Sequence, residues 1–282
     1  MNDEENSLPP TRFLCRKGTP EQNLKMQKNI LVMGCGRSGT SMLAGLFAKS
    51  GYFMGDNLHP GRVSNPKGFF EDPEINTINE YILFGAAMAR VKIGKIELFK
   101  SRPLPNHRWL AQIKLNPLLI SNPDIEDRIK KIVDRAPYCL KDPRFSYTLP
   151  VWRPFLSNHV FLCIFREPEA TARSMVKEVR DVRREQGYLN YINYRQALSV
   201  WTCMYTHIVK VHRRDGDWLF VHYNQVLNGE VFNKIETFTC TSIDRSFPDP
   251  LLRRSKVFRP TWNPIPRRLY ATLCTLAGYE GA

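Results

Sequence analysis

Short apolar runs alternate along the chain with longer segments in which apolar residues recur at helical spacing. The runs that we expect to form strands are 30–33, 138–140, 160–165 and 218–222. The segments that we expect to form helices are 40–50, 73–90, 125–135, 168–185, 194–213 and 230–238. Strands that alternate with helices are typical of a mostly parallel sheet, because each return to the same edge needs a crossover helix. The pattern therefore predicts a three-layer α/β fold, with a central sheet flanked by helices.

Three stretches lie outside this alternation. Residues 1–26 are interpreted as a polar N-terminal tail, so that 27–282 forms a single domain. The segment of about 92–122 contains Pro103, Pro105 and Pro117 and is predicted to be an irregular insertion or lid. The proline-rich and basic C-terminal segment, about 247–282, is predicted to be extended and able to close over a site.

Composition narrows the class of protein. A chain of 282 residues with 43% apolar residues can bury a sizeable core. The net charge of +14 suits an acidic ligand, but the basic residues are spread from Arg12 to Arg268 rather than gathered in one run. We therefore expect no nucleic-acid partner. The N-terminus is acidic, and no segment approaches the roughly 18 apolar residues that a membrane span needs. The expectation is a cytoplasmic protein without a transmembrane anchor.

The seven cysteines show no spacing typical of metal ligands. Several lie in apolar strands or helices, which predicts reduced and mostly buried thiols. Cys35 lies in a glycine-rich loop, where it is either a reactive thiol or simply a small side chain. We expect no metal site.

That glycine-rich loop, Asn29–Ser41, joins an apolar strand to an apolar helix. Gly34 and Gly39 have the spacing of a nucleotide-binding P-loop, but Thr40 stands where the P-loop lysine belongs, and Arg37 is the loop's only cation. A glycine turn that leads into a helix still aims backbone N–H groups at an anion. The loop therefore predicts a P-loop-type fold that binds phosphate without triphosphate chemistry. The alternative is an ordinary glycine turn.

A second candidate phosphate site follows the strand 159–165. Arg166 ends this strand at the carboxyl edge of the sheet, where ligands of such folds usually bind. Ser174 lies eight residues later, two turns into the next helix. An arginine and a hydroxyl so placed can hold one phosphate from two directions, because the guanidinium favours bidentate contact. The alternative is a surface arginine beside a serine of the helix cap.

Together these two motifs resemble those of the sulfotransferases that take sulfate from 3′-phosphoadenosine-5′-phosphosulfate (PAPS). The loop Gly36-Arg37-Ser38-Gly39-Thr40-Ser41 is similar to the family's 5′-phosphosulfate loop, in the arginine-bearing form of tyrosylprotein and many bacterial sulfotransferases. Arg166 and Ser174 match, in spacing and order, the pair that holds the 3′-phosphate. The resemblance spans roughly residues 29–225. It implies PAPS as the co-substrate and no metal.

The resemblance also gives a role to residues outside the two motifs. The segment Tyr138–Arg144 is similar to the family's Lys-Asp-Pro segment, which implies that Lys141 stabilises the transferring sulfuryl group. A salt bridge between Lys141 and a surface acid is the alternative. Tyr223 resembles the tyrosine near the adenine, although Asn-Gln follows it where Glu-Asp is commoner, and it could instead belong to the core. Arg253 and Arg254, in the C-terminal segment, are assigned to cofactor binding.

Sulfuryl transfer needs a base for the acceptor hydroxyl and cations at the leaving oxygen. Arg37 suits the second role. For the base we choose Glu71, because the stretch Asn65–Glu74 looks like the Gly-aromatic-aromatic-Glu segment of bacterial sulfotransferases. Alternatively, Asp72 caps the next helix and Glu71 merely favours its N-terminal end. His59 and His107 are the other candidates for the base, and His59 is the better of the two.

The acceptor is the least constrained part of this interpretation. The segments 52–70, 92–122 and 180–195 mix aromatic and basic residues, which suits a glycan and equally suits a peptide tyrosine or a phenol. We expect a hydroxyl of a carbohydrate or glycolipid, and a homo-oligomer stays open. Two other functions remain at this point: a P-loop kinase or NTPase with an atypical loop, and a nucleotide-binding protein without catalytic activity.

Overall fold

The central sheet is fully parallel. The computed structural model describes residues 27–93, 96–101, 103–187, 191–252 and 263–281. The four strands lie in the order β4-β1-β5-β6. Their bounds are Asn29–Met33 (β1), Cys139–Lys141 (β4), His159–Phe165 (β5) and Trp218–His222 (β6). Each agrees with a predicted strand to within one residue, so the α/β fold expected from the hydrophobic pattern is confirmed.

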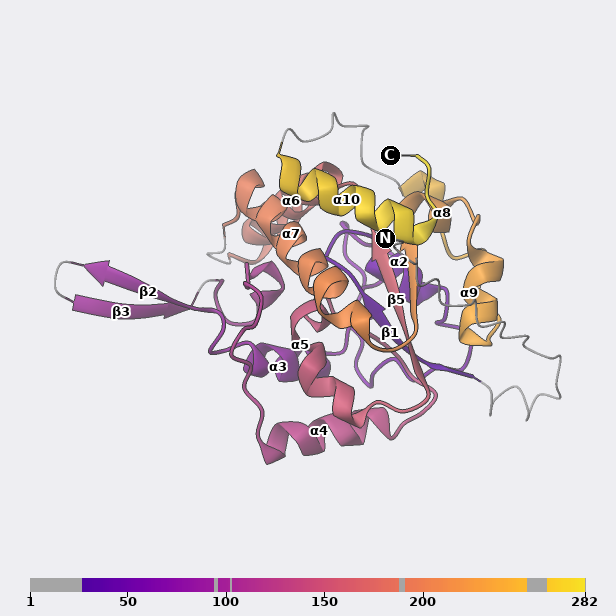
Figure 1. Cartoon of the computed structure of the whole chain (residues 1–282), viewed down its shortest axis with the longest axis horizontal. Coiled ribbons are helices and arrows are strands. Elements are labelled where there is room, and N and C mark those ends of the chain that lie inside the picture. The colour runs from indigo at the N-terminus through magenta and orange to yellow at the C-terminus, as the bar shows by residue number, and fades with distance from the viewer. Residues whose placement is uncertain (1–26, 94–95, 102, 188–190, 253–262, 282) are drawn as a thin grey trace, which may run out of the picture.

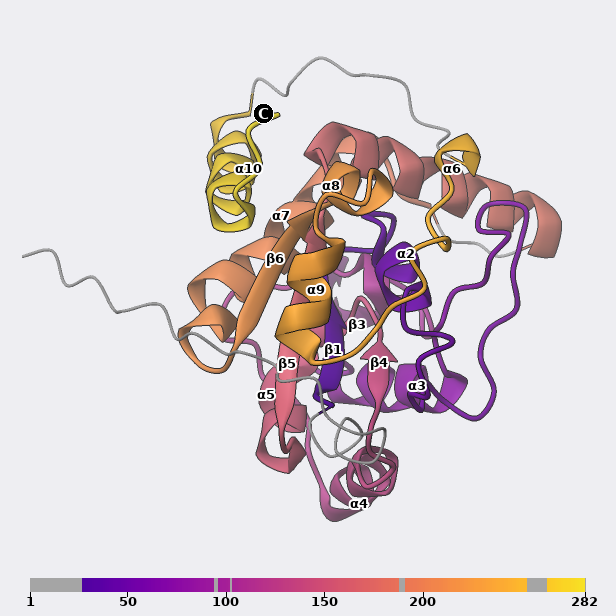
Figure 2. The same cartoon turned by 90° about the vertical axis from the view of Figure 1, so that its right-hand side faces the viewer.

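Helices cover both faces of this sheet (Figures 1 and 2). Their bounds are Thr40–Gly45 (α2), Pro73–Ile82 (α3), Pro123–Val133 (α4), Phe145–Trp152 (α5), Pro168–Gln186 (α6), Tyr194–Lys210 (α7), Tyr223–Leu227 (α8), Phe232–Thr239 (α9) and Pro264–Ala277 (α10). Short 3₁₀ turns span Arg108–Leu110, Arg153–Phe155, His212–Arg214 and Pro250–Leu252.

Successive side chains of each strand pack into two separate hydrophobic cores, one on each face of the sheet. In β1, Ile30 and Val32 pack with side chains of α2, α8 and α9, whereas Leu31 and Met33 pack with those of α3 to α7 and α10. This division follows from the two-residue period of a strand, which sends successive side chains to opposite faces. Because both faces are covered, the strands read as continuous apolar runs rather than alternating ones. Figure 2 shows α9 lying across one face of the sheet.

Two predicted helices are shorter than expected. α2 ends at Gly45 rather than at 50, and α3 ends at Ile82 rather than at 90. The residues after α3 instead join an antiparallel hairpin of β2 (Met88–Ile93) and β3 (Ile96–Ser101), which projects from the rest of the molecule in Figure 1. The prediction of an irregular segment from about 92 is therefore wrong for its first part, where β2 ends and β3 follows. Two runs containing β-branched residues on either side of Gly94 were the sequence signal for this hairpin.

The prediction of an extended segment through 282 is wrong for its last part, because Pro264–Ala277 forms the helix α10. Asn263 caps this helix by accepting a hydrogen bond from Ile265 N–H, and Gly278 ends it at φ 61°. The proline at 264 suggested extension, yet proline is favoured in the first turn of a helix, where its missing N–H costs nothing. The predicted tail 1–26 lies outside the described residues. No described helix has both the length and the apolar character that crossing a bilayer demands.

Candidate functional site

The loop between β1 and α2 is strained in the way that a phosphate-binding turn requires. Gly34 and Gly39 have φ of 138° and 100°, in the region that favours glycine. A methyl group on Gly34 would lie 2.4 Å from the carbonyl oxygen of Ile164. Arg37 also takes a positive φ, of 70°. The glycines thus let the loop pack directly against β5 and turn sharply at Arg37.

Tyr205, a buried residue of α7, forms hydrogen bonds to both this loop and β5. The Tyr205 hydroxyl donates to the carbonyl oxygen of Ile164 over 2.8 Å and accepts from the N–H of Cys35 over 3.2 Å. The side chain of Cys35 is fully buried, and burial raises the pKa of its thiol well above the ordinary range. Cys35 is therefore a neutral residue that packs in the core. Of the two alternatives from the sequence, a reactive thiol or a small side chain, the second is correct.

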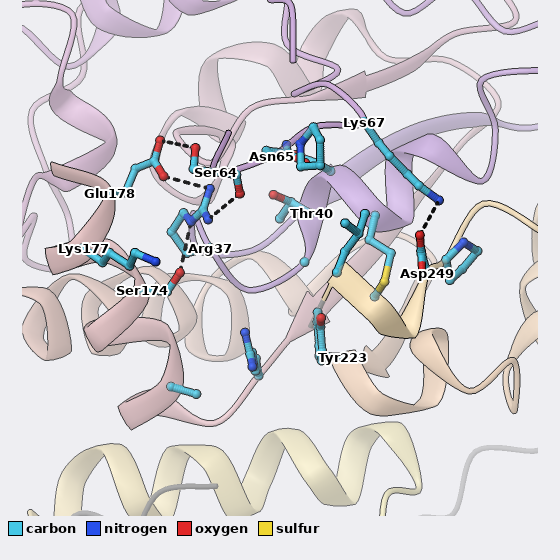
Figure 3. Close-up of a pocket in the computed structure, with 18 of the residues that line it drawn as sticks. Arg37, Thr40, Ser64, Asn65, Lys67, Ser174, Lys177, Glu178, Tyr223 and Asp249 are labelled. Carbon is cyan, nitrogen blue, oxygen red and sulfur yellow. Dashed lines mark hydrogen bonds and ion pairs between the residues drawn. The ribbon is translucent and has the colours of Figure 1, made fainter. Parts of the chain in front are cut away.

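A first cavity of about 300 Å³ lies on one side of Arg37 (Figure 3). Five segments far apart in the sequence form its wall: the loop with the start of α2, residues 64–67, Arg166 with α6, the start of α8, and residues 247–252. Its lining residues include Arg37, Thr40, Lys67, Arg166, Ser174, Lys177, Glu178 and Tyr223. The two motifs singled out in the sequence therefore meet at one cavity.

Arg37 is held from three directions at the edge of this cavity. Its Nε donates to Ser174 Oγ over 3.2 Å, and its Nη2 donates to the carbonyl oxygen of Ser64 over 3.1 Å. Its Nη1 lies 3.3 Å from Oε2 of Glu178, one helical turn after Ser174 on α6. The Glu178 side chain is 8% exposed and also accepts from the Ser64 hydroxyl over 3.0 Å. A buried carboxylate thus neutralises the loop's cation in this structure.

Arg166 and Tyr223 line the same cavity and contact each other. Arg166 is buried, and its guanidinium carbon lies 4.3 Å from the centre of the Tyr223 ring. The same ring packs on the loop, because a methyl group on Gly39 would lie 2.7 Å from it. Glu167 lies 3.5 Å from Nε of Arg166. Tyr223 is only half-buried and lines the cavity, so its position fits the predicted role better than a core role.

A second cavity of about 420 Å³ lies on the other side of Arg37. It shares Arg37, Thr40, Ser41 and Glu178 with the first cavity. Its other lining residues include Gly36, His59, Phe69, Glu71, Asn76, Thr77, His107 and Trp109. Because Arg37 belongs to both walls, a group held by its guanidinium would stand between the two cavities.

Glu71 and Lys141 form an ion pair beside the second cavity. Nζ of Lys141 donates to Oε1 of Glu71. The lysine side chain is 1% exposed, whereas that of Glu71 is 16% exposed. Burial lowers the pKa of Lys141, and the neighbouring Glu71 carboxylate opposes this shift. The sequence interpretation considered a surface acid as the partner of Lys141. The partner is instead Glu71, the residue chosen as the base. Lys141 itself lines neither cavity.

The histidine candidates lie on the same side. Nε2 of His59 is 3.1 Å from Oδ1 of Asn76, and the His59 N–H donates to the Glu71 carbonyl oxygen over 2.8 Å. His107 also lines the second cavity, and burial lowers its pKa. Asp72 caps α3 by accepting from the N–H of Glu74 over 2.7 Å. The capping function therefore falls to Asp72, while the side chain of Glu71 pairs with Lys141 and lines the second cavity.

Of the predicted site residues that the structure describes, Ser38 and Lys141 line neither cavity. Ser38 is buried, its hydroxyl lies 3.4 Å from that of Thr171, and its N–H donates to the carbonyl oxygen of Cys35. Arg253 and Arg254 lie outside the described residues. The remaining residues of the predicted loop, Gly36 to Ser41 without Ser38, line at least one of the cavities.

Sequence reasoning missed Asn76, Glu178 and Lys67. Asn76 and Glu178 each follow a predicted site residue within one or two helical turns, which is the signal that could have identified them. Lys67 reaches across the first cavity, where its Nζ lies 3.9 Å from Oδ2 of Asp249. In the described part of the chain, no three histidine, cysteine, aspartate or glutamate side chains gather as metal ligands would.

Comparison with known proteins gives only a distant likeness. Neither a model of a protein family nor a curated protein matches the chain. Among solved structures, the chain is similar to a sulfotransferase domain from the curacin biosynthetic pathway, with 16% identity, a TM-score of 0.48, and coverage of 90% of this chain and 98% of that one.

Two bacterial sulfotransferases are similar to a comparable degree. The enzyme from Alicyclobacillus acidocaldarius has 12% identity and a TM-score of 0.46, over 90% of this chain and 97% of its own. The sulfotransferase STF9 from Mycobacterium avium has 13% identity and a TM-score of 0.46, over 93% of this chain and 80% of its own. At these values the chemistry has to be inferred from the two cavities themselves.

Proposed function

We propose that this protein is a sulfotransferase that moves a sulfuryl group from PAPS to a hydroxyl of a second substrate. The observation that carries the proposal is the meeting of two phosphate motifs at Arg37 and Ser174, on a cavity that adjoins a second one through Arg37. A donor nucleotide with phosphates at both the 3′ and 5′ positions requires two anion sites close together. An acceptor requires a separate space that opens onto the reacting group.

The first cavity would hold the donor. Arg37, with the glycine-rich loop and Thr40, would take the 5′-phosphosulfate, while Arg166 and Ser174 would take the 3′-phosphate. Tyr223 would lie beside the adenine, and the roles proposed for Arg253 and Arg254 stay predictions. The lining is basic on balance and suits an anion: the cations Arg37, Lys67, Arg166, Arg173 and Lys177 outnumber the acids Glu178, Asp181 and Asp249. The 5′-phosphosulfate would lie beside Glu178, so the Arg37 guanidinium, which has five N–H donors, would divide them between that carboxylate and the phosphate.

The second cavity would hold the acceptor. In the transfer, the acceptor oxygen bonds to sulfur, the bond from sulfur to the bridging oxygen breaks, and the leaving phosphate keeps that electron pair. Glu71 would receive the hydroxyl proton, and Arg37 would stabilise the charge that develops on the bridging oxygen. Lys141 would orient Glu71 through their ion pair, and its contact with the transferring group stays a prediction, since Lys141 lines neither cavity.

A carbohydrate or glycolipid hydroxyl is the acceptor that we propose. The wall of the second cavity combines the aromatic rings of Trp109 and Phe69 with the polar side chains of His59, Glu71 and Asn76. An apolar ring face beside several hydrogen-bonding groups suits a sugar, which has C–H faces and hydroxyl edges. The cytoplasmic location expected from the sequence and the possible homo-oligomer stay predictions.

The test is transfer of ³⁵S from labelled PAPS to a panel of sugars, glycolipids, phenols and tyrosyl peptides without added metal. We expect labelled product with at least one sugar acceptor. Titration with the desulfonated nucleotide, 3′-phosphoadenosine-5′-phosphate (PAP), measures donor-site binding independently of the acceptor. Hydrolysis of ATP that depends on Mg²⁺, together with no binding of PAP, would contradict the proposal and favour a P-loop NTPase. Tight PAP binding without transfer to any acceptor would favour a nucleotide-binding protein that lacks catalysis.

A further inference from the structure

Asn76, near the start of α3, contacts Glu71 and His59 of the second cavity and also the buried Asp142, which lines neither cavity. Its Nδ2 donates to Oδ2 of Asp142 over 2.8 Å and makes a long hydrogen bond of 3.5 Å to Oε2 of Glu71. Its Oδ1 lies 3.1 Å from Nε2 of His59. Asn76 is therefore the one described side chain that we find joining both leading candidates for the proton acceptor.

Asp142 decides which way the Asn76 amide points. The Asp142 carboxylate is fully buried and ion-paired with Arg144, whose Nη1 lies 3.0 Å from Oδ1. Its Oδ2 also accepts from Asn79 over 3.0 Å. An ionised carboxylate only accepts hydrogen bonds, so the Asn76 nitrogen rather than its oxygen must face it. The amide orientation is thus fixed by chemistry, although oxygen and nitrogen have almost the same shape.

This orientation has a consequence for His59. Because Oδ1 of Asn76 can only accept, the ring nitrogen facing it must carry a proton. In the neutral imidazole the proton then sits on Nε2, and Nδ1 is the only nitrogen able to accept another. The backbone hydrogen bond from His59 N–H to the Glu71 carbonyl oxygen holds the main chains of the two residues side by side.

The same amide orients Glu71 from a second side. Lys141 contacts Oε1 of Glu71, and Asn76 contacts Oε2, so each carboxylate oxygen has its own donor. A base that is held at both oxygens keeps one orientation toward the cavity, which favours proton transfer along a fixed path.

We propose that Asn76 is a positioning residue for the acceptor side of the site: held by Asp142, it orients Glu71 beside Lys141 and keeps His59 in the Nε2–H tautomer. This inference rests on the proposed sulfotransferase function for its kinetic consequence. Its structural consequence, the tautomer of His59, can be measured in a protein of any function.

The first experiment is two-bond ¹H–¹⁵N NMR of full-length protein labelled at histidine, at pH 8.5, where a free imidazole is neutral. The chain has six histidines, and the signals of His59 are identified as those that disappear in His59→Gln. We expect a protonated Nε2 and an unprotonated Nδ1 at His59. Asn76→Ala should give a mixture of tautomers. Thr77→Ala, at the next position of α3, should leave the tautomer unchanged because the Thr77 hydroxyl donates to the Pro73 carbonyl oxygen and not to His59.

An Nδ1–H tautomer in the wild-type protein would overturn the inference, even if Asn76→Ala does not fold. An unchanged tautomer in folded Asn76→Ala would also overturn it.

The second experiment measures kinetics with the same variant. Asn76 lines the second cavity and not the first, so Asn76→Ala should lower kcat about tenfold to a hundredfold and leave the affinity for PAP within about twofold. Full kcat in this variant would refute the positioning role. If the wild-type protein transfers no sulfate, the proposed function is wrong. The NMR measurement of the His59 tautomer still tests whether Asn76 orients His59.

Discussion

The Nε atom of Arg37 donates a hydrogen bond of 3.2 Å to the hydroxyl of Ser174, which lies 137 residues later in the chain. The sequence interpretation gave these residues to different phosphates of one nucleotide. Their direct contact means that the two phosphate sites would be neighbours in one cavity. Glu178 lies one helical turn after Ser174 on α6, and its carboxylate also contacts Arg37 in this structure.

Arg37→Ala should weaken PAP binding by about 2–5 kcal/mol, the usual cost of removing one partner of a buried charge pair. Isothermal titration measures this loss. The substitution also leaves Glu178 buried without its cation, so the single variant should be less stable than wild type. The double variant Arg37→Ala/Glu178→Gln removes that unpaired charge, and we expect it to recover stability without recovering affinity. Wild-type affinity in the double variant would show that Arg37 does not hold the nucleotide.

Arg166→Ala should reduce the affinity for PAP by a similar 2–5 kcal/mol and leave the affinity for adenosine 5′-monophosphate nearly unchanged. The two nucleotides differ in the 3′-phosphate, which is the group assigned to Arg166. Arg180→Ala is the matched control, because Arg180 is an exposed cation of α6 outside both cavities. Equal losses for the two nucleotides would place Arg166 elsewhere on the donor.

Glu71→Gln should lower turnover by roughly 10² to 10⁴, the usual contribution of a general base, and leave PAP binding intact. The glutamine keeps an oxygen that can accept from Lys141, so the local packing is preserved. Glu74→Gln is the control, since Glu74 lies three residues later and pairs with Arg128 at the surface. Steady-state kinetics of Glu71→Gln and Glu74→Gln test whether Glu71 is the general base. Full turnover in Glu71→Gln would transfer the role of base to His59, which His59→Gln would then test.

His212 should make the folded state sensitive to acid. Burial lowers the pKa of its imidazole to about 4, against an ordinary value of 6.5. As the pH falls below 6.5, the unfolded chain therefore takes up a proton before the folded protein does. The folded state loses roughly 3 kcal/mol from this group by pH 4.

Urea unfolding of wild type and His212→Gln at pH 7 and pH 4 measures this effect. The glutamine cannot titrate but can still donate to the Ser146 carbonyl oxygen, which Nε2 of His212 contacts at 3.1 Å. We expect the loss of stability between the two pH values to be smaller in the variant. Other buried histidines, such as His207, are present in both proteins and cancel in the comparison.

Local rules were sufficient for the four strands of the central sheet and for the cap of α3, but they did not predict the hairpin of β2 and β3. Four apolar runs became four parallel strands, and Asp72 caps α3 as its position before Pro73 predicted. They failed for α5 and α10, where Pro150 lies inside a helix and Pro264 begins one. In α5, packing against the core outweighs the cost of Pro150, whereas Pro264 stands at the first position of α10, where proline is favoured. Leu149 and Leu273, one in each helix, are fully buried.

The sequence by itself determined the chemistry available at the site: a loop with Arg37 in place of a lysine, an arginine and serine eight residues apart, and a carboxylate before a helix. Spacing within a motif is local, because the strand, turn and helix that carry it have fixed geometry. Only the tertiary structure decided which residues meet, since contacts such as Arg37 with Glu178 and Lys141 with Glu71 join segments brought together by the parallel sheet. No spacing along the chain encodes those pairs, and they determine which cation and which carboxylate a ligand would encounter.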